Sequence, residues 1–525
     1  MPFSSCVKET AQSKLGARTS SSATRRSRAK LFASLIADED VRGPSIQLKS
    51  FCELLTLVFS IVAFAAVCNA QPSDRVAAAR IDRYIASQMR RYKIPGMSVA
   101  VVRNGKVSIL KSYGLANVEL GVPVKPQTIF QSGSIGKQLT AAAIMVLVQE
   151  GKISLNDRVS KYLSDTPATW NDITIRHLLT QTSGLGDYPP EIELRRDYTE
   201  DQFIDIFKKA PLNFAPGTDW DYSNVGYVTL GIIISKVTGK FYGEFLREKV
   251  FKPLEMTTAR VISEEDIVPN RAAGYRLVNS QLKNQEWVSP STNSTADGSY
   301  YLSILDLVNW DRGLDSTRAN ALFTQPTLDQ IWQPTKLSDG RVKGYGFGWF
   351  TMRLHNRRVA FHGGAWQGFK SYIVKFLDDK LTLMFLANSW EANDFRMARG
   401  LMSIFYPEFA ANESFGDYRR EPKVTQLVHR ALLGFANDKV NKELFTAELQ
   451  SELFPAKANK IREQLRSLSL PVAVIHLSEL VEKKVVGDLR VYRYAIVDIG
   501  QSMVCTVKLR QDDKIAGIEI GSESR

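Results

Sequence analysis

Residues 130–140 constrain the fold most, because they run without a break into the apolar residues 141–148. The pattern predicts a helix that begins near Ser134 and ends at Gly151, since glycine commonly terminates helices. Lys137 follows Ser134 by three residues, so both side chains lie on one face of this helix. A neighbouring amine can activate a hydroxyl, and a helix N-terminus favours developing negative charge. The segment therefore predicts an activated serine.

The Ser-x-x-Lys spacing has an alternative interpretation. In most such matches the serine caps a helix and the lysine lies at the surface. The same spacing, without comparable neighbours, occurs elsewhere in the chain at Ser5/Lys8, Ser27/Lys30 and Ser108/Lys111. The other motifs of the chain must decide between the two interpretations.

Residues 1–70 predict a leader with a signal peptide. An apolar core at 54–66 follows Lys49 and precedes small residues up to Ala70, the pattern of a secretory signal with its cleavage edge. This pattern indicates a secreted or periplasmic protein without stable membrane insertion after cleavage. The alternatives are a membrane anchor formed by the uncleaved segment and an organelle transit peptide, because residues 1–37 are rich in Ser and Arg.

Composition excludes several classes of function. The 525 residues are 44% hydrophobic and 23% charged, as in ordinary globular chains of two or three domains. A net charge of +13 suits an anionic surface such as a cell wall, but no basic run interleaved with aromatic residues indicates nucleic acid. Only Cys505 follows the leader, so the mature chain can form no internal disulfide. The five histidines show no ligand spacing, and the sequence predicts neither metal nor cofactor.

The middle of the chain predicts a sheet interrupted by a helical lobe. An amphipathic helix at 75–93 precedes a hairpin, whose strands at 98–103 and 106–111 flank the turn Asn104-Gly105. Helical patterns follow the candidate nucleophile at 155–163, 173–185, 202–209 and 226–238. Strand patterns then resume at 344–350, 357–361, 371–376 and 380–387.

The polar, turn-like residues 410–421 predict a domain boundary. We therefore expect a domain at 71–411 and a small α+β module at 412–525. Within the module, helices are predicted at 424–436, 442–453 and 457–468, and strands at 472–479, 489–497, 503–509 and 515–520. It contains no catalytic constellation.

Two further motifs supply candidate site residues. Tyr222 and Asn224 alternate at the end of a loop rich in turn formers, so in extended backbone both side chains face one cleft. The alternative is an Asn helix cap beside a packing tyrosine. His362 begins a His-Gly-Gly segment whose glycines let a ligand approach the backbone, unless it is a bulge with an incidental histidine. His177, inside a predicted helix, is expected to be a buried structural residue.

Ser134-x-x-Lys137, Tyr222-x-Asn224 and His362-x-Gly364, in this order, resemble the motifs of the serine β-lactamase-like hydrolases, in particular the class C β-lactamase, D-Ala-D-Ala peptidase and esterase branch. Residues 173–185 also resemble a stretch typical of that family, and the resemblance covers about 75–405. It implies an α+β, β-lactamase/transpeptidase-like fold, with an antiparallel sheet flanked by helices beside an all-helical lobe. It also implies that the backbone N–H groups of Ser134 and Ala365 form an oxyanion hole.

The identity of the general base stays open at this point. Unperturbed tyrosine and lysine titrate near 10 and 10.4, so neither is a ready base at neutral pH. A positive Lys137 would lower the pKa of Tyr222 and make it the base, whereas desolvation would make Lys137 the base. Such coupled groups need not titrate separately.

The third motif departs from the Lys-Thr-Gly that is usual in β-lactamases of this branch. A neutral or partly charged His362 holds a substrate carboxylate less firmly than lysine does. The resemblance therefore implies an exported serine hydrolase that acts through an acyl-enzyme on esters or D-amino-acid amides and peptides, peptidoglycan-derived ones included. A class C-type β-lactamase or D-Ala-D-Ala carboxypeptidase is the alternative, and a non-catalytic cell-wall-binding or sensor protein is a third.

Overall fold

The computed structural model describes residues 72–262, 266–354, 356–407, 416–417, 422–436, 438–466, 479–498 and 501–522. Residues 70–525 form one compact unit, separate from residues 1–69. The predicted leader and most of the predicted boundary at 410–421 lie outside the described residues, as does nearly all of the predicted strand at 472–479. Within the described ranges, no helix has the length and apolar character needed to cross a membrane.

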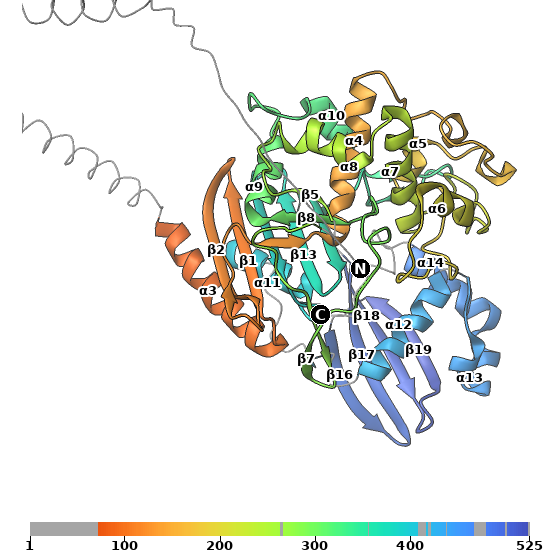
Figure 1. The fold of residues 1–525 in the computed structure, drawn as a ribbon. Coiled ribbons are helices and arrows are strands. Elements are labelled where there is room, and N and C mark those ends of the chain that lie inside the picture. Colours follow the sequence, from red (N-terminus) through yellow and green to blue (C-terminus); the bar gives the residue numbers. More distant parts are fainter. Residues whose placement is uncertain are drawn as a thin grey trace, which may run out of the picture. The chain divides into compact units, whose positions relative to one another are not determined.

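A seven-stranded antiparallel sheet organises the unit (Figure 1). Its order is β11-β12-β13-β14-β1-β2-β3. The strands are β1 (Gly96–Arg103), β2 (Lys106–Asn117), β3 (Val122–Pro123), β11 (Phe350–Leu354), β12 (Arg357–Trp366), β13 (Phe369–Phe376) and β14 (Leu381–Ala387). The predicted hairpin is confirmed, because Asn104 and Gly105 join β1 to β2 with φ angles of 50° and 71°. The sheet begins before the helical lobe and is completed after it.

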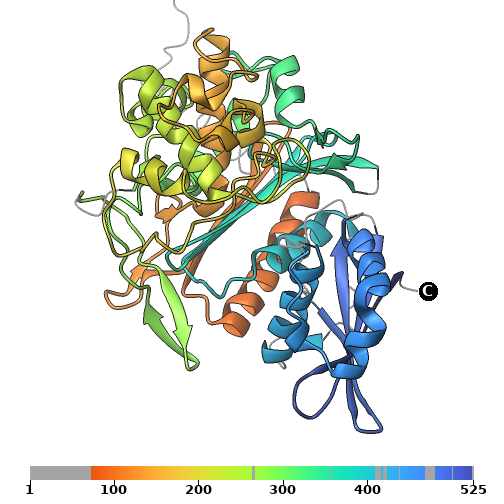
Figure 2. The ribbon, with the colours of Figure 1, turned by 90° about the vertical axis from the view of Figure 1, so that its right-hand side faces the viewer.

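Helices cover both faces of this sheet. On one face α3 (Pro72–Tyr92) and α11 (Asp394–Phe405) lie side by side (Figure 2). On the other face α9 (Ile304–Gly313) packs against β1 and β14. Side chains of β1 alternate between the two cores, with Val99 in the first and Ala100 in the second. Both faces are therefore buried.

The helical lobe follows β2 and β3 in the chain. Its helices are α4 (Gly136–Gln149), α5 (Ile175–Leu179), α6 (Glu200–Phe207), α7 (Asn224–Thr238), α8 (Tyr242–Leu246) and α10 (Gln325–Ile331). Three short strands pair in the order β4-β8-β5, and two small hairpins complete the domain. These strands are β4 (Ile129–Gln131), β5 (Arg260–Val261), β6 (Tyr275–Val278), β7 (Gln281–Asn284), β8 (Tyr300–Ser303), β9 (Thr335–Lys336) and β10 (Val342–Lys343).

Three predicted elements of this region are wrong. The pattern at 155–163 forms only a 3-10 turn at Val159–Lys161, and the helix predicted at 173–185 is reduced to the five residues of α5. Residues 344–349 are not a strand. There the glycines serve close approach, because a Cβ on Gly346 would lie 2.1 Å from the Ile331 carbonyl oxygen.

The C-terminal residues form helices and a second antiparallel sheet. The helices are α12 (Pro422–Ala436), α13 (Ala447–Glu452) and α14 (Ala458–Arg466). The sheet has the order β15-β16-β17-β18-β19, formed by Gly416–Asp417, Glu479–Val486, Leu489–Asp498, Gln501–Leu509 and Ile515–Ser522. The last three strands were predicted and β16 was not. The division at 411/412 stays a prediction.

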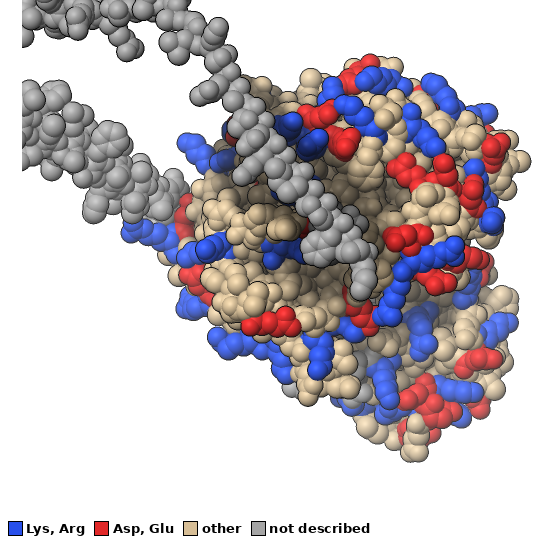
Figure 3. All heavy atoms as spheres, viewed as in Figure 1, with Lys and Arg blue, Asp and Glu red and all other residues tan. Residues whose placement is uncertain are grey.

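Charge is mixed over the surface that Figure 3 draws. Lys and Arg side chains alternate there with Asp and Glu side chains, and neither sign forms a continuous patch. Proteins that bind nucleic acid through its phosphates concentrate basic side chains on one face. The face in Figure 3 has no such concentration.

Candidate active site

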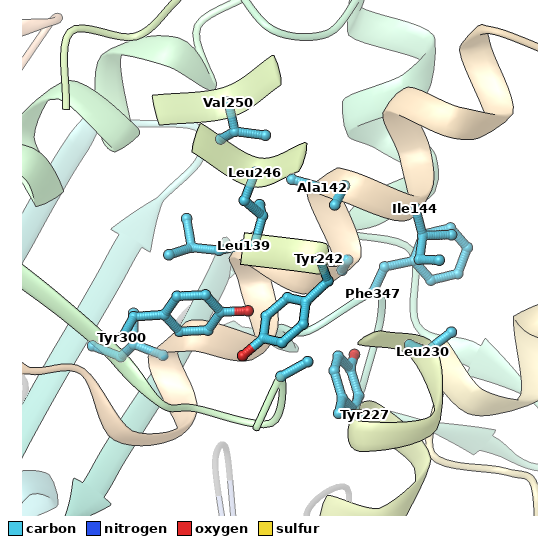
Figure 4. Packing of buried hydrophobic residues seen from close by; sticks show 14 of the residues in the cluster. Leu139, Ala142, Ile144, Tyr227, Leu230, Tyr242, Leu246, Val250, Tyr300 and Phe347 are labelled. Atoms are coloured by element: carbon cyan, nitrogen blue, oxygen red, sulfur yellow. The ribbon is translucent and has the colours of Figure 1, made fainter. Parts of the chain in front are cut away.

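The helix α4 forms the rigid base of the site. Every residue from Gly136 to Leu147 is buried, which explains why its sequence is apolar on all sides. Figure 4 shows Leu139 and Ala142 of α4 among side chains of α8, and Ile144 beside Phe347. The packing fixes the first turn of the helix in place.

Ser134 and Lys137 meet at this first turn. Ser134 lies in the short 3-10 helix η1 (Gly133–Ile135), which leads directly into α4. The Lys137 Nζ donates a hydrogen bond to the Ser134 Oγ at 3.2 Å. Lys137 has no exposed surface, and no side chain caps either helix. The alternative of a capping serine with a surface lysine does not describe this pair.

Lys137 makes two more hydrogen bonds with oxygen atoms. Its Nζ donates to the Asn224 Oδ1 at 2.6 Å and to the Asp297 carbonyl oxygen at 2.7 Å. Burial lowers the pKa of Lys137 to about 8, although the charges of Asp297 and Asp187 oppose this shift. The amine therefore changes charge near neutral pH while hydrogen-bonded to the serine.

Tyr222, in the loop before α7, and Asn224, the first residue of α7, reach the same place. Ser223 is the N-cap of α7, so the alternative of an Asn cap is wrong. Asn224 also donates to the Asp187 Oδ1 at 2.9 Å. The Lys137 Nζ lies 4.8 Å from the centroid of the Tyr222 ring. Burial raises the pKa of Tyr222 well above its ordinary value, as does Tyr345, while a hydrogen bond with Ser134 opposes the rise.

His362 is buried and has partners at both ring nitrogens. Its Nδ1 lies 2.6 Å from the Gly363 carbonyl oxygen, and its Nε2 lies 3.3 Å from the Tyr345 hydroxyl. A carbonyl oxygen only accepts, so we assign the proton to Nδ1, and Nε2 accepts from Tyr345. Burial lowers the pKa of His362 to about 3, which makes the ring neutral at physiological pH.

Strand β12 presents Ala365 to the nucleophile. The pairing of β11 with β12 ends at Phe361, and the following residues of β12 contact η1 instead. A Cβ on Gly364 would lie 3.0 Å from the Ser134 nitrogen, and a Cβ on Gly133 would lie 2.4 Å from the Ala365 nitrogen. The two glycines thus bring both backbone N–H groups to one place.

Replacing Gly364 by alanine is expected to lower kcat by about a hundredfold or more, because a misplacement of about 1 Å has this effect on positioned groups. The added methyl group would lie 2.1 Å from the Ser132 carbonyl oxygen and push η1 away from β12. Steady-state kinetics and circular dichroism measure the outcome. Gly521→Ala, where a Cβ meets open space, is the control. A folded Gly364→Ala enzyme with unchanged kcat would contradict this prediction.

Ser134 lies at a cavity of about 290 Å³. Ser134, Tyr222, Phe350, Phe361, His362, Gly363, Gly364, Ala365, Tyr372, Asp394 and Phe395 line it. The sequence analysis did not identify four residues of this region, because no motif or spacing marks them. They are Asp394 and Phe395 in the lining, and the acids Asp187 and Asp297 near Lys137. His177 lies apart from this lining, half-buried in α5, where its ring accepts from the Thr174 N–H.

Comparisons with known proteins identify the family of this chain. The Beta-lactamase family model matches residues 81–403. The chain is 26% identical over 408 residues to penicillin-binding protein 4* of Bacillus subtilis (strain 168), which covers 71% of this chain and 89% of that protein. It is 28% identical over 329 residues to a D-aminopeptidase of Gluconobacter oxydans (strain 621H), covering 60% of this chain but only 59% of the relative.

Solved structures share the fold. A structure described as the octameric penicillin-binding protein homologue from Pyrococcus abyssi has a TM-score of 0.56 at 22% identity, covering 85% of this chain and 98% of its own. The D-amino acid amidase from Ochrobactrum anthropi SV3, complexed with L-phenylalanine amide, has a TM-score of 0.54 at 22% identity, covering 64% and 99%. The predicted α+β, β-lactamase/transpeptidase-like fold is confirmed. Because the family match spans more than half of the chain, this protein belongs to the Beta-lactamase family and is a serine hydrolase of that family.

Proposed function

We propose that the protein hydrolyses esters or D-amino-acid amides and peptides through an acyl-enzyme on Ser134, in a secreted or periplasmic location reached through its leader. The observation that carries the proposal is the 3.2 Å contact between the buried Lys137 Nζ and the Ser134 Oγ. In its neutral form the amine donates its two N–H groups to Asn224 and to the Asp297 carbonyl oxygen and accepts a hydrogen bond from the serine hydroxyl. A fully buried lysine is costly to keep charged, and a lowered pKa makes it a usable base. A membrane anchor formed by an uncleaved leader is the alternative location.

Lys137 is the general base of this proposal. Its neutral amine takes the proton of the Ser134 hydroxyl while the Oγ bonds to the substrate carbonyl carbon. The carbonyl electrons move onto oxygen, where the N–H groups of Ser134 and Ala365 stabilise the negative charge. Tyr222 is a poor base, because burial holds its hydroxyl in the protonated form.

In this proposal Tyr222 protonates the leaving group, which is the second half of acylation. As the tetrahedral intermediate collapses, the bond to the leaving group breaks, and that group takes a proton from the Tyr222 hydroxyl. The Lys137 ammonium then returns its proton to Tyr222, so both residues end as they began. Hydrolysis of the acyl-enzyme follows the same steps with water in place of serine. Lys137 takes a proton from the water, and the departing Ser134 Oγ takes one from Tyr222. Asn224 holds Lys137 through its Oδ1.

Two observations favour amide or ester substrates over β-lactams. The named relatives include a D-aminopeptidase, and a D-amino acid amidase shares the fold. In addition, His362 is neutral and uses both ring nitrogens within the protein, so it supplies no cation for a substrate carboxylate. The second candidate function is that of a D-Ala-D-Ala carboxypeptidase or class C-type β-lactamase. The similarity to a penicillin-binding protein supports it. A purely cell-wall-binding or sensor protein would have no use for a buried amine at a serine.

A substrate panel tests this proposal. We expect kcat/KM for short-acyl esters or D-amino-acid amides to exceed that for any β-lactam by at least tenfold. The reason is the missing charge-assisted hydrogen bond to the β-lactam carboxylate, worth about 1.5–3 kcal/mol or one to two decades. Parallel steady-state assays with esters, D-aminoacyl amides, D-Ala-D-Ala peptides and cephalosporins give the ratios. A preference for a cephalosporin would replace the proposal with the second candidate.

The pH dependence of kcat/KM should follow Lys137. Because its neutral form is the base and its pKa is lowered to about 8, kcat/KM should rise about tenfold per pH unit below 8 and level off above it. His362, with a pKa lowered to about 3, should add no inflection near 6.5. An uncharged substrate assayed from pH 5 to 10 measures the profile. A flat profile from pH 6 to 9 would exclude Lys137 as the base.

A further inference from the structure

We propose that Asp394 makes the cavity beside Ser134 a binding site for organic ammonium groups, so that the enzyme prefers cationic substrates and rejects carboxylates. This inference rests on the proposed function, since the cavity is the one that holds the nucleophile. It identifies the charge that a good substrate carries and the residue that selects it.

Asp394 lies against the backbone of the third motif. It is the first residue of α11, and its Oδ1 accepts a hydrogen bond from the Phe395 N–H at 3.0 Å. Its Oδ2 lies 2.7 Å from the position of a Cβ on Gly363. A side chain at position 363 would therefore meet this carboxylate oxygen, and Gly363 and Asp394 both line the cavity.

Asp394 is the acidic residue of that lining. His362 is neutral, and burial keeps the hydroxyls of Tyr222 and Tyr372 protonated. Lys137 acts in its neutral form, and its amine is held by Asn224 and the Asp297 carbonyl oxygen. Among the described residues, no cation forms an ion pair with Asp394. The lining therefore holds one acid and neither lysine nor arginine, which favours a cationic substrate group over an anionic one.

The surroundings of Asp394 strengthen its effect. Phe350, Phe361, Tyr372 and Phe395 form much of the cavity wall, and a charge acts more strongly beside apolar surface than in bulk water. The cations on α11 are directed elsewhere, because Arg396 and Arg399 lie near Tyr84 of α3 and lower its pKa. An ammonium group in the cavity thus gains the attraction of the carboxylate, with a charge-assisted hydrogen bond where it carries an N–H, whereas a carboxylate meets repulsion.

An ordinary structural role is the rival explanation. An acid in the first turn of a helix stabilises that helix through its dipole. Such a role predicts that removal of the charge changes the thermal stability and affects all substrates alike. Selection of ammonium groups predicts a change in the ratio between substrates of equal shape and different charge.

Two pairs of substrates measure that ratio. D-Alanine p-nitroanilide and isobutyric acid p-nitroanilide differ by an ammonium against a methyl group on the acyl side. Acetylcholine and 3,3-dimethylbutyl acetate differ by a quaternary ammonium against a neutral tert-butyl group on the leaving side. In the wild type, kcat/KM for the cation should exceed that for its neutral partner at least tenfold in one pair or both. The pair that responds identifies the side of the substrate that faces Asp394.

Asp394→Asn should reduce at least tenfold the ratio of kcat/KM in a pair that shows the preference, whatever its effect on the absolute rates of the two substrates. Glu391→Gln, which removes an acid outside the cavity lining, is the matched control and should change neither. If Asp394→Asn does not fold, inhibition of wild-type hydrolysis of 3,3-dimethylbutyl acetate by tetramethylammonium, but not by tert-butanol, gives the same answer. An unchanged preference in Asp394→Asn, or no cation preference in either wild-type pair, overturns the inference. If the wild type hydrolyses none of the four substrates, that result refutes the proposed function instead.

Discussion

Ser134→Ala is expected to abolish turnover by about three orders of magnitude or more and to remove the site of covalent modification. The reason is that the Oγ carries the acyl group, and no other group can take its place in this step. Treatment with a serine-reactive phosphonate should add one adduct to the wild type by intact-mass measurement and none to the variant.

Ser108→Ala is the matched control for this experiment. Ser108 shares the Ser-x-x-Lys spacing with Lys111, but it lies in β2 and Lys111 pairs with Asp82 at 3.3 Å. This variant should keep the adduct and the full rate. An adduct that persists in Ser134→Ala would place the nucleophile elsewhere.

Lys137→Met is expected to lower kcat by about three orders of magnitude, within the usual range for loss of a general base. Methionine fills most of the space of the lysine stem without the buried charge. The substitution also leaves the Asn224 Oδ1 and the Asp297 carbonyl oxygen without their donor, so the free energy of unfolding should fall by about 1–3 kcal/mol. Steady-state kinetics and thermal melting measure the two effects separately.

Lys111→Met provides the comparison for Lys137→Met. It removes a half-exposed lysine with the same spacing to a serine, and it should leave kcat unchanged. A Lys137→Met enzyme that keeps kcat within tenfold of wild type would transfer the role of base to Tyr222. The rising limb of the pH profile should also disappear in Lys137→Met.

The sequence predicted those parts of the fold and of the site that depend on residues close together in the chain. The start of α4 and the turn at Asn104-Gly105 follow from residues a few positions apart, and the three motifs predicted the fold and family. The balance between Lys137 and Tyr222 was open, because burial decides it and burial depends on the whole lobe. Burial lowers the pKa of Lys137 and raises that of Tyr222, which supports the proposal that Lys137 is the base.

The failed strand prediction at 344–349 has a physical cause. Gly348 has a φ of 76°, and a Cβ on it would lie 2.8 Å from the Lys137 carbonyl oxygen. The alternation of glycine and aromatic residues there reflects close approach to α4 instead of a pleated strand. Asp394 escaped notice for a related reason, since its place beside Gly363 arises from packing of α11 on the sheet, which no local pattern encodes.

The end of the β11–β12 ladder at the pair Phe350↔Phe361 limits how this chain can change in length. Successive residues of a strand point to opposite faces, so an inserted residue between 357 and 361 would turn every later residue of β12 over. Ala365 would then direct its N–H away from η1, although no residue of the site had been replaced. An insertion in the connection between β11 and β12 precedes the ladder and leaves its register intact. Insertions and deletions should therefore be tolerated in that connection and inactivating a few residues later.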